Sequence, residues 1–442
     1  MAKTSAFRAS ILHCLADPGG VTDQSRSSAL EYFDDGLLIV DNGRVRETGD
    51  AGALLPKLSD DVRVVDHRDK LIIPGMIDCH VHFPQVDIIA SYGERLLDWL
   101  REYAYPAERG FADADHAAEV ADFFVGELLR NGTTTALVFA TVHPQSADAI
   151  FDKALNRNMR LAAGKVLMDK NCPEDLRDDA QSAYADSLAL IEKWHGKGRL
   201  SYAITPRFAV TSSEGQLAEA GRLASEHPDV YVHTHLAEND DEVELIAKQF
   251  SWSRSYLDVY EHFGLLRERS VFAHCLHLDD RDRKSMADAG GAIAFCPTSN
   301  LFLGSGLFDL RQAEDNKIRV GLGTDVGGGT SLSVLRTASE AYKVLHLQDQ
   351  ALPPFKALYL ATLGAAEALY LDDKIGNFEP GKEADFVVLD AAATSITSRR
   401  LGRSKDIAEK LFALMVLGDD RCVTATYLMG RLAHGSESPE SH

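Results

Sequence analysis

The chain has 442 residues, 45% of them hydrophobic and 26% charged, which are the proportions of a globular protein. Acidic residues outnumber basic ones by 67 to 46, and the formal charge of −21 disfavours nucleic acid and anionic membrane surfaces as partners. The six scattered cysteines predict no disulfide framework. The sequence shows neither a signal-peptide pattern nor an apolar run of about 18 residues, so we expect a cytoplasmic protein.

The first 70 residues are expected to form one part of a small β-rich domain. Short strands are predicted at 7–14, 36–41 and 44–49. Asp41-Asn42-Gly43 is typical of a hairpin turn, and it would join the last two of these strands.

From residue 71 to about 370, short β-like runs alternate with amphipathic helical stretches. This alternation predicts βαβ units with a parallel sheet. Eight such runs favour a closed (β/α)₈ barrel, assigned to 71–372, over an open doubly wound sheet. The runs are 71–79, 133–142, 160–168, 199–207, 229–235, 269–275, 291–296 and 318–325. Helices are predicted at Phe111–Arg130, Ser182–Trp194, Ser213–Glu226 and Asp240–Phe263.

The C-terminal part of the chain is β-rich again. Residues 373–435 contain β-like runs at 384–389 and Val423–Leu428. We expect this part to join residues 1–70 in one small domain built from both ends of the chain. Residues 436–442 are polar and are predicted to form a flexible tail.

His80 and His82 are the strongest indication of chemistry in the sequence. They end the first apolar run, and residues i and i+2 of a strand point to the same side. Two imidazoles there can hold one metal ion. The pattern also arises by chance, because a histidine at a strand end is often only solvated or hydrogen-bonded.

Further candidate ligands lie at the ends of later runs, namely His235, His274 and Asp325. Active sites of such barrels lie at the C-terminal strand ends, so these side chains are expected to meet the first pair. Histidine and aspartate suit zinc, and the same set would also hold iron. We expect His274 to lie beside the metal, since a further ligand would crowd the nucleophile. Asp325 could alternatively cap a helix or form an Asx turn.

Other residues near these positions are assigned no metal. His233 and His277 are expected to be core or rim histidines. Lys165 lies in the third run, so no lysine stands at the fourth strand end, where a carboxylated lysine would bridge two metals. One metal per chain is therefore expected. The glycines of 327–329 lack the GxGxxG spacing and are interpreted as a turn.

Two more side chains are candidates for proton transfer and substrate binding. Glu238 follows His235 by three residues and would reach a metal-activated water at the barrel mouth. Taken alone, it would more often be a solvated acid opening the run 238–242; the ligand pattern reverses this preference. Arg207 ends the fourth run and could offer its donor fork to a substrate carbonyl, or form a surface ion pair.

Several segments together resemble the amidohydrolase superfamily and, within it, the guanine deaminase family. The superfamily features are Pro74-Gly75-Met76-Ile77-Asp78 before the His-x-His, His-Leu-Ala-Glu at 235–238, Ala-His at 273–274 and Gly-Thr-Asp at 323–325. The segments similar to guanine deaminases are 82–85, 96–100, 105–108, 131–136, 164–169, 205–208 and 323–329.

The resemblance implies a fold, a reaction and a set of roles. The expected fold is a (β/α)₈ barrel with a small β-rich domain, and the expected reaction is hydrolysis of guanine to xanthine and ammonia. The implied ligands of one zinc are His80, His82, His235 and Asp325. Proton handling is implied for Glu238, His274 and Asp325, and purine binding for Gln85, Arg207, Phe208 and Trp99. Family members are dimers, which implies a homodimer here.

Two alternatives remain open at this point. A related enzyme of the superfamily could act on another purine, a pterin or a triazine. More remotely, the chain could be a non-catalytic scaffold that has kept the barrel.

Overall fold

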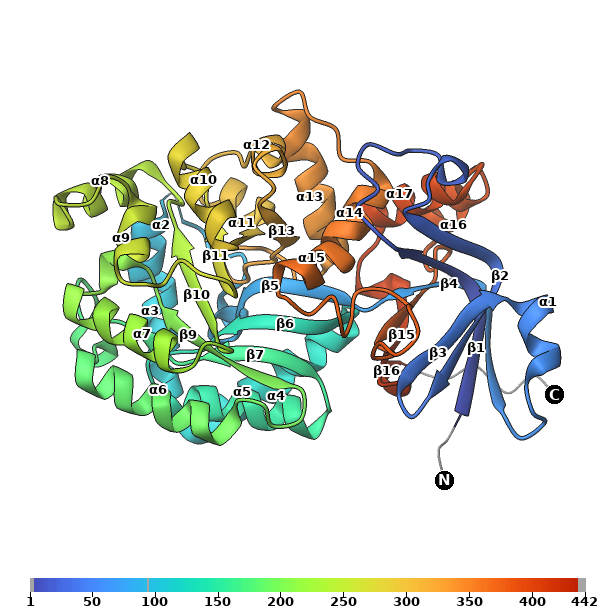
Figure 1. Cartoon of the computed structure of the whole chain (residues 1–442), viewed down its shortest axis with the longest axis horizontal. Helices are drawn as coiled ribbons and strands as arrows, with labels where there is room; N and C mark the ends of the chain where they lie inside the picture. The colour runs from blue at the N-terminus through green and yellow to red at the C-terminus, as the bar shows by residue number, and fades with distance from the viewer. Residues whose placement is uncertain (1–3, 94, 436–442) are drawn as a thin grey trace.

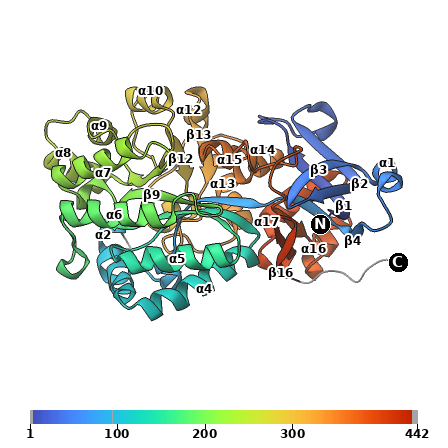
Figure 2. The ribbon, with the colours of Figure 1, turned by 60° about the horizontal axis from the view of Figure 1, so that its bottom comes forward.

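The computed structural model describes residues 4–93 and 95–435. A barrel and a second sheet lie side by side in it (Figure 1), and the same separation is seen after rotation (Figure 2). The predicted tail at 436–442 lies outside the described residues.

The barrel is a sheet of parallel strands, which confirms the predicted barrel architecture. Its hydrogen-bonded order is β5-β6-β7-β9-β10-β11-β12-β13, with the short β8 paired to β9. The strands are β5 Met76–His82, β6 Thr133–Phe139, β7 Arg160–Gly164, β8 Val166–Leu167, β9 Leu200–Pro206, β10 Tyr231–Leu236, β11 Ser270–His274, β12 Ala292–Phe295 and β13 Arg319–Leu322. Every residue of β5, β6 and β10 is buried, which explains why these strands read as continuous apolar runs.

Helices surround the barrel and follow its strands along the chain (Figure 1). The larger ones are α4 Ala114–Arg130, α5 Pro144–Asn156, α6 Ala180–Trp194, α7 Glu214–Glu226, α8 Asp240–Gln249, α9 Tyr256–His262, α10 Asp280–Ala289, α11 Pro297–Phe302, α12 Leu310–Asp315, α13 Val334–His346, α14 Pro354–Ala361 and α15 Leu363–Ala368. Short helices α2 Leu96–Trp99 and α3 Tyr105–Arg109 flank a π-helical turn, Leu100–Ala104.

Helix α4 illustrates how the sequence specifies these elements. Asp113 caps it by accepting hydrogen bonds from the backbone N–H groups of Asp115 and His116. Its buried residues recur at helical spacing, so one face packs on the barrel. They are Ala117, Val120, Ala121, Phe124, Val125, Leu128 and Leu129.

The second sheet is built from both ends of the chain. Its order is β16-β15-β14-β4-β1-β2-β3, and β4 lies between parallel β1 and antiparallel β14. The strands are β1 Thr4–Cys14, β2 Leu30–Asp41, β3 Arg44–Asp50, β4 Arg63–Pro74, β14 Phe386–Leu389, β15 Val423–Leu428 and β16 Arg431–Gly435. The remaining helices are α1 Ala51–Leu54, α16 Ser395–Leu401 and α17 Ile407–Leu417.

The predicted hairpin between β2 and β3 is confirmed. Asn42 and Gly43 both have positive φ, 52° and 80°, as a two-residue turn between twisted strands requires. The apolar centre of the sheet contains Phe386 stacked on Tyr427, with ring centroids 4.5 Å apart, and Phe7 at an angle to both.

Two predicted elements are wrong in their extent. Leu71–Pro74, expected at the start of the first barrel strand, belong to β4 and pair with β14, and the barrel strand begins at Met76. Both stretches are apolar and buried, so periodicity could not separate them. The helix predicted over Asp240–Phe263 is divided into α8 and α9, because Ser255 caps a new helix by accepting from the Asp258 N–H.

The barrel closes beside the end of β5. The Asp325 N–H donates to the His80 carbonyl and the His82 N–H donates to the Val326 carbonyl, both at 2.9 Å. Asp78 accepts from the backbone N–H groups of His80 at 3.2 Å and Thr324 at 3.0 Å. These bonds fix the His-x-His segment against the Gly-Thr-Asp segment.

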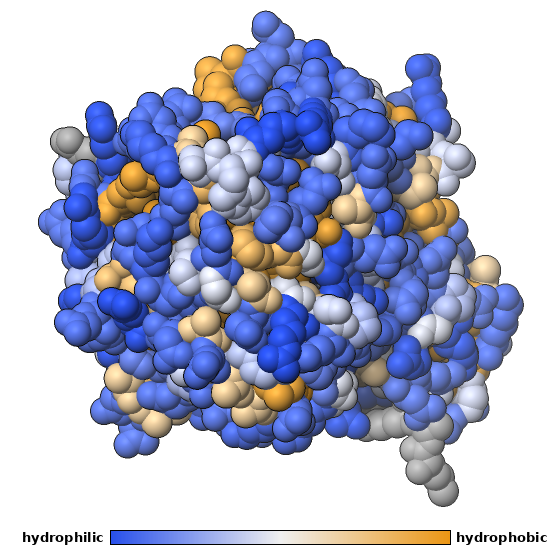
Figure 3. Space-filling view, turned by 60° about the vertical axis from the view of Figure 1, so that its left-hand side comes forward, coloured by the Kyte–Doolittle hydropathy of each residue, from blue (hydrophilic) through white to orange (hydrophobic). Residues whose placement is uncertain are grey.

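The outer surface is mainly hydrophilic. Hydrophilic side chains cover most of the face in Figure 3, and apolar side chains form small separate groups there. Within the described residues, no helix is both long and apolar enough to cross a membrane.

Candidate active site

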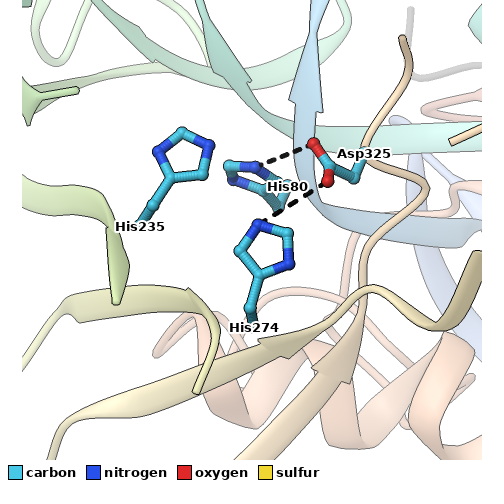
Figure 4. Close-up of side chains that lie close together, drawn as sticks. All are labelled: His80, His235, His274 and Asp325. Atoms are coloured by element: carbon cyan, nitrogen blue, oxygen red, sulfur yellow. Dashed lines mark ion pairs between the residues drawn. The ribbon is translucent and has the colours of Figure 1, made fainter. Parts of the chain in front are cut away.

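Four of the predicted site residues meet at the C-terminal ends of the barrel strands. Figure 4 shows His80, His235, His274 and Asp325 facing one another. Their ligand atoms all lie within 4.8 Å of one another, and all four residues are buried. His80 Nε2 lies 3.1 Å from Asp325 Oδ1, and His274 Nε2 lies 3.6 Å from Asp325 Oδ2. His274, expected beside the metal, therefore lies slightly farther from Asp325 than His80 does.

His82 belongs to the same cluster. Its Nε2 lies 3.2 Å from the Nε2 atoms of both His80 and His235, and 3.3 Å from Asp325 Oδ1. The structure thus brings all four predicted metal ligands together, with His274 as a fifth neighbour. The distances alone do not show which four of these five residues would bind the metal.

Neighbouring groups orient three of these imidazoles through Nδ1. His80 Nδ1 lies 2.7 Å from His233 Nε2, and His235 Nδ1 donates to the Arg207 carbonyl at 2.6 Å. His274 Nδ1 donates to Asn300 Oδ1 at 2.8 Å. Such bonds leave Nε2 as the atom that faces the cluster, which is how metal-binding histidines are usually held.

The donor set fits a divalent cation of the zinc type. It offers imidazole nitrogens and one carboxylate. His274 Nε2 is buried and has no hydrogen-bond partner among the described residues. Burial lowers the pKa of His82 to about 3 and lowers the pKa of His235 well below its usual value. Both are therefore neutral, the state that metal binding requires.

The backbone at the cluster adopts uncommon conformations. Ala237, His274 and Asp325 have positive φ angles of 49°, 72° and 49°. Side chains other than glycine rarely occupy this region, and residues held there concentrate at functional sites. The chain turns at these three residues, and Glu238, His274 and Asp325 line the pocket there.

Glu238 is a buried acid, so its alternative reading as a solvated surface residue is wrong. Its side chain is 3% exposed, and its Oε2 lies 3.4 Å from His274 Nε2. Ser305 Oγ donates to its Oε1 at 2.9 Å, and its own N–H donates to Glu242 Oε2 at 2.9 Å. Burial, reinforced by the nearby Asp325, raises the pKa of Glu238 to about 8. A carboxyl group that titrates near neutrality suits general acid–base catalysis.

Arg207 is buried as well, so the surface ion pair considered for it is wrong. Its Nη1 donates to both oxygens of Glu108, at 2.8 and 2.7 Å, and its guanidinium lies over the Tyr105 ring at 5.2 Å. Gln85 Nε2 donates to the same carboxylate at 3.0 Å. Glu108 was not predicted as a site residue, and its only signal was the segment 105–108.

One pocket joins these groups. It encloses about 380 Å³ when the space at its open mouth is included. The lining residues are His82, Gln85, Leu96, Trp99, Leu100, Arg207, Phe208, His235, Glu238, His274, Ser299, Leu303, Asp325 and Gly328. All the predicted site residues except His80 are among them. Five lining residues were not predicted as site residues. Three of them lie in the family-like segments 96–100 and 323–329, namely Leu96, Leu100 and Gly328, whereas Ser299 and Leu303 had no signal in the sequence.

The residues assigned no metal lie away from the cluster or behind it. His233 is buried behind His80, and His277 lies at the rim, 3.3 Å from Asp240. Lys165 is fully buried, with its Nζ 2.5 Å from Asp178 Oδ2, and does not line the pocket.

Comparison with known proteins identifies the family. A model of the amidohydrolase family matches residues 71–433. Guanine deaminase of Escherichia coli K12 is 51% identical over 408 residues, 92% of this chain and 93% of that protein. The structure of E. coli guanine deaminase superimposes with a TM-score of 0.94 at 49% identity, over 98% of this chain and 99% of the other. Guanine deaminase of C. acetobutylicum with guanine bound in its active site gives a TM-score of 0.87 at 27% identity, over 97% and 100%. The chain therefore belongs to the amidohydrolase family.

Proposed function

We propose that this protein is a guanine deaminase, which hydrolyses guanine to xanthine and ammonia. The observation that carries the proposal is a single pocket with two different walls. One wall holds the histidine–aspartate cluster and Glu238, and the other holds Arg207 and Gln85. The 51% identity to the E. coli guanine deaminase supports the same substrate.

We propose one zinc ion per chain, with iron as the alternative, held by His80, His82, His235 and Asp325. A divalent cation in this position would make water a strong nucleophile at neutral pH. The absence of a lysine at the end of β9, which runs into Pro206 and Arg207, supports one ion and not two. His274 is the alternative ligand, because its Nε2 lies 3.6 Å from Asp325 Oδ2.

Glu238 is proposed to move the protons. It takes one proton from the attacking water and passes it to a ring nitrogen of guanine. The amino group then receives the second water proton and leaves as ammonia, while the carbon atom keeps the oxygen. His274 and Asp325 face Glu238 across the cluster and would hold the water during these transfers.

The opposite wall is proposed to recognise the purine. Arg207 offers donors to a 6-oxo group, and Gln85 offers an amide to the neighbouring ring edge. Phe208 and Trp99 line the same pocket and supply apolar contact to the planar base. Adenine has an amino group at the 6 position, so it would leave the Arg207 donors unpaired.

The same side chains bear on the two alternatives, another substrate and a non-catalytic scaffold. A pterin carries its carbonyl at the 4 position, next to a ring N–H as in guanine, and could use part of this wall, whereas a triazine lacks the carbonyl that Arg207 would bind. A scaffold without activity does not account for a fully buried cluster beside a buried acid, since unpaired buried ionisable groups are costly.

A substrate panel read by ammonia release tests the function. Guanine is expected to give the highest kcat/KM, with adenine, a pterin and an aminotriazine far lower. Release of ammonia from one of these compounds at a higher kcat/KM than from guanine would replace the proposal with that substrate. Absence of ammonia from all of them, in metal-loaded protein, would favour the scaffold.

We also propose that the protein is a cytoplasmic homodimer. Light scattering is expected to give a mass about twice the 48.3 kDa of one chain. A monomeric mass at assay concentration would contradict the dimer.

A further inference from the structure

We propose that Glu108 is a positioning residue that orients Arg207 and Gln85 and keeps the purine wall of the pocket electrically neutral. This inference rests on the proposed function. Glu108 is carried by α3, is 1% exposed, and does not line the pocket. It therefore acts on the substrate only through the two residues it holds.

Glu108 determines which donors of Arg207 remain for a ligand. Both carboxylate oxygens accept from one nitrogen, Nη1, at 2.8 and 2.7 Å. The Nε and Nη2 groups of Arg207 have no acceptor among the described residues, and the side chain lines the pocket. The carboxylate thus fixes the plane of the guanidinium from behind and leaves its other donors for the base.

Glu108 also determines how the Gln85 amide faces. A carboxylate accepts hydrogen bonds but donates none, so Gln85 Nε2 must point to it, as the 3.0 Å contact shows. Gln85 Oε1 accepts from the Gly327 N–H at 3.2 Å on the other side. Rotation of the amide by half a turn would place oxygen against oxygen and lose both bonds.

The charge of Glu108 has a separate consequence. Guanine is neutral, and the paired Arg207 and Glu108 present no net charge to it. Without the carboxylate, a buried guanidinium would stand alone and would favour an anion. Xanthine has a second carbonyl and loses an N–H proton more readily than guanine does. Glu108 is therefore expected to limit product binding.

The same helical segment couples this anchor to the pocket wall. Leu100 lines the pocket at the start of the π-helical turn, and Trp99 lines it at the end of α2. Glu108 lies on α3 at the other end of that turn. An irregular turn of this kind often marks a functional site. Here one short segment supplies both the apolar pocket residues Trp99 and Leu100 and the buried Glu108, which holds Arg207 and Gln85.

The test is Glu108→Gln, which keeps the shape but removes the charge. We expect KM for guanine to rise by about tenfold or more while kcat changes less. We also expect the inhibition constant of xanthine to fall relative to KM. Glu102→Gln lies on the same segment, is exposed, and is the matched control. Metal content and thermal melting verify that each variant is folded and loaded.

A double-mutant cycle separates positioning from general damage. If Glu108 acts mainly through Arg207, then Glu108→Gln should lower kcat/KM less in an Arg207→Met background than in the parent, leaving only the part that acts through Gln85. Glu108→Asp keeps the charge but is shorter, so it should raise KM without tightening xanthine binding. It carries the test if Glu108→Gln does not fold.

The inference is overturned if Glu108→Gln behaves like Glu102→Gln. It is also overturned if the loss is equally large with and without Arg207. A parent protein that releases no ammonia from guanine would instead refute the proposed function.

Discussion

Glu238→Gln is the sharpest test of the proposed proton transfers. Glutamine has the same length and can still accept from Ser305 Oγ, which lies 2.9 Å from Oε1. The backbone N–H of residue 238 keeps its bond to Glu242. Glu238 is outside the group of His80, His235, His274 and Asp325, so metal should remain bound.

The expected loss follows from the number of proton transfers removed. General acid–base catalysis contributes about 10²–10⁴-fold. Glu238 is assigned both the uptake and the delivery of a proton, so the loss should reach the upper end. A loss of about 10⁴-fold corresponds to about 5.4 kcal/mol in the activation free energy. Glu242, the neighbouring buried acid, accepts from the Glu238 backbone N–H through its Oε2 and is therefore not placed to replace Glu238.

The assay measures metal content and ammonia release in the same sample. Glu244→Gln, on the exposed face of α8, is the control and should match the parent. Retained metal with activity within a few-fold of the parent would refute the role of Glu238. Proton transfer would then fall to Asp325 or His274.

In chelator-treated protein, Glu238→Gln should also change how the free energy of unfolding depends on pH. Burial raises the pKa of Glu238 from 4.5 to about 8. Between these values the folded state holds a proton that the unfolded state has released, so stability falls as pH rises through this window. Glu238→Gln lacks this loss, and its free energy of unfolding should gain on the parent from pH 5 to pH 8. An equal difference at both pH values, measured by denaturant unfolding, would contradict the buried acid.

Three further outcomes are expected. Arg207→Met should lower kcat/KM for guanine by roughly 5- to 150-fold, because a buried donor lost from a carbonyl costs about 1–3 kcal/mol; unchanged guanine kinetics would remove Arg207 from the pocket. Elemental analysis should give close to one zinc or iron per chain, and two metals in active protein would refute the mononuclear site. Gly164→Ala should lower the melting temperature, since a Cβ there would lie 1.7 Å from the Ala203 carbonyl oxygen and overpacking typically costs about 1–3 kcal/mol. If the variant melted at the same temperature as the parent, β7 and β9 would be able to move apart at that point without loss of stability.

The barrel could be predicted because its strands are buried on both faces and recur between amphipathic helices. The same property caused the error at 71–79, where β4 and β5 follow each other with only Gly75 between them. Pro74-Gly75 interrupts the run at that point, but the apolar residues on either side of it do not show that the chain leaves one sheet for another. The division between α8 and α9 depended on a single cap at Ser255, which a periodic pattern does not reveal.

The candidate site could be predicted where strand ends determine position. His82, His235 and His274 lie at or next to the ends of their strands, so their convergence followed from barrel topology. Glu108 could not be found in this way, because it lies on a short helix and meets Arg207 from 99 residues away. Burial of Glu238 and Arg207 depends on tertiary packing. The sequence alone therefore did not exclude a solvated Glu238 or a surface ion pair of Arg207.

The mixed origin of the second sheet affects how the chain is made on the ribosome. One edge of β4 pairs with β1 early, but its other edge pairs with β14, along Leu71–Pro74. Roughly 300 residues separate the two strands, so at about 5–20 residues per second that edge waits for about 15–60 s. Leu71, Ile72 and Ile73 are apolar, and an unpaired apolar edge is a template for association with other chains. Slow or crowded synthesis should therefore lower the yield of this protein more than that of a barrel whose flanking sheet is encoded in one piece.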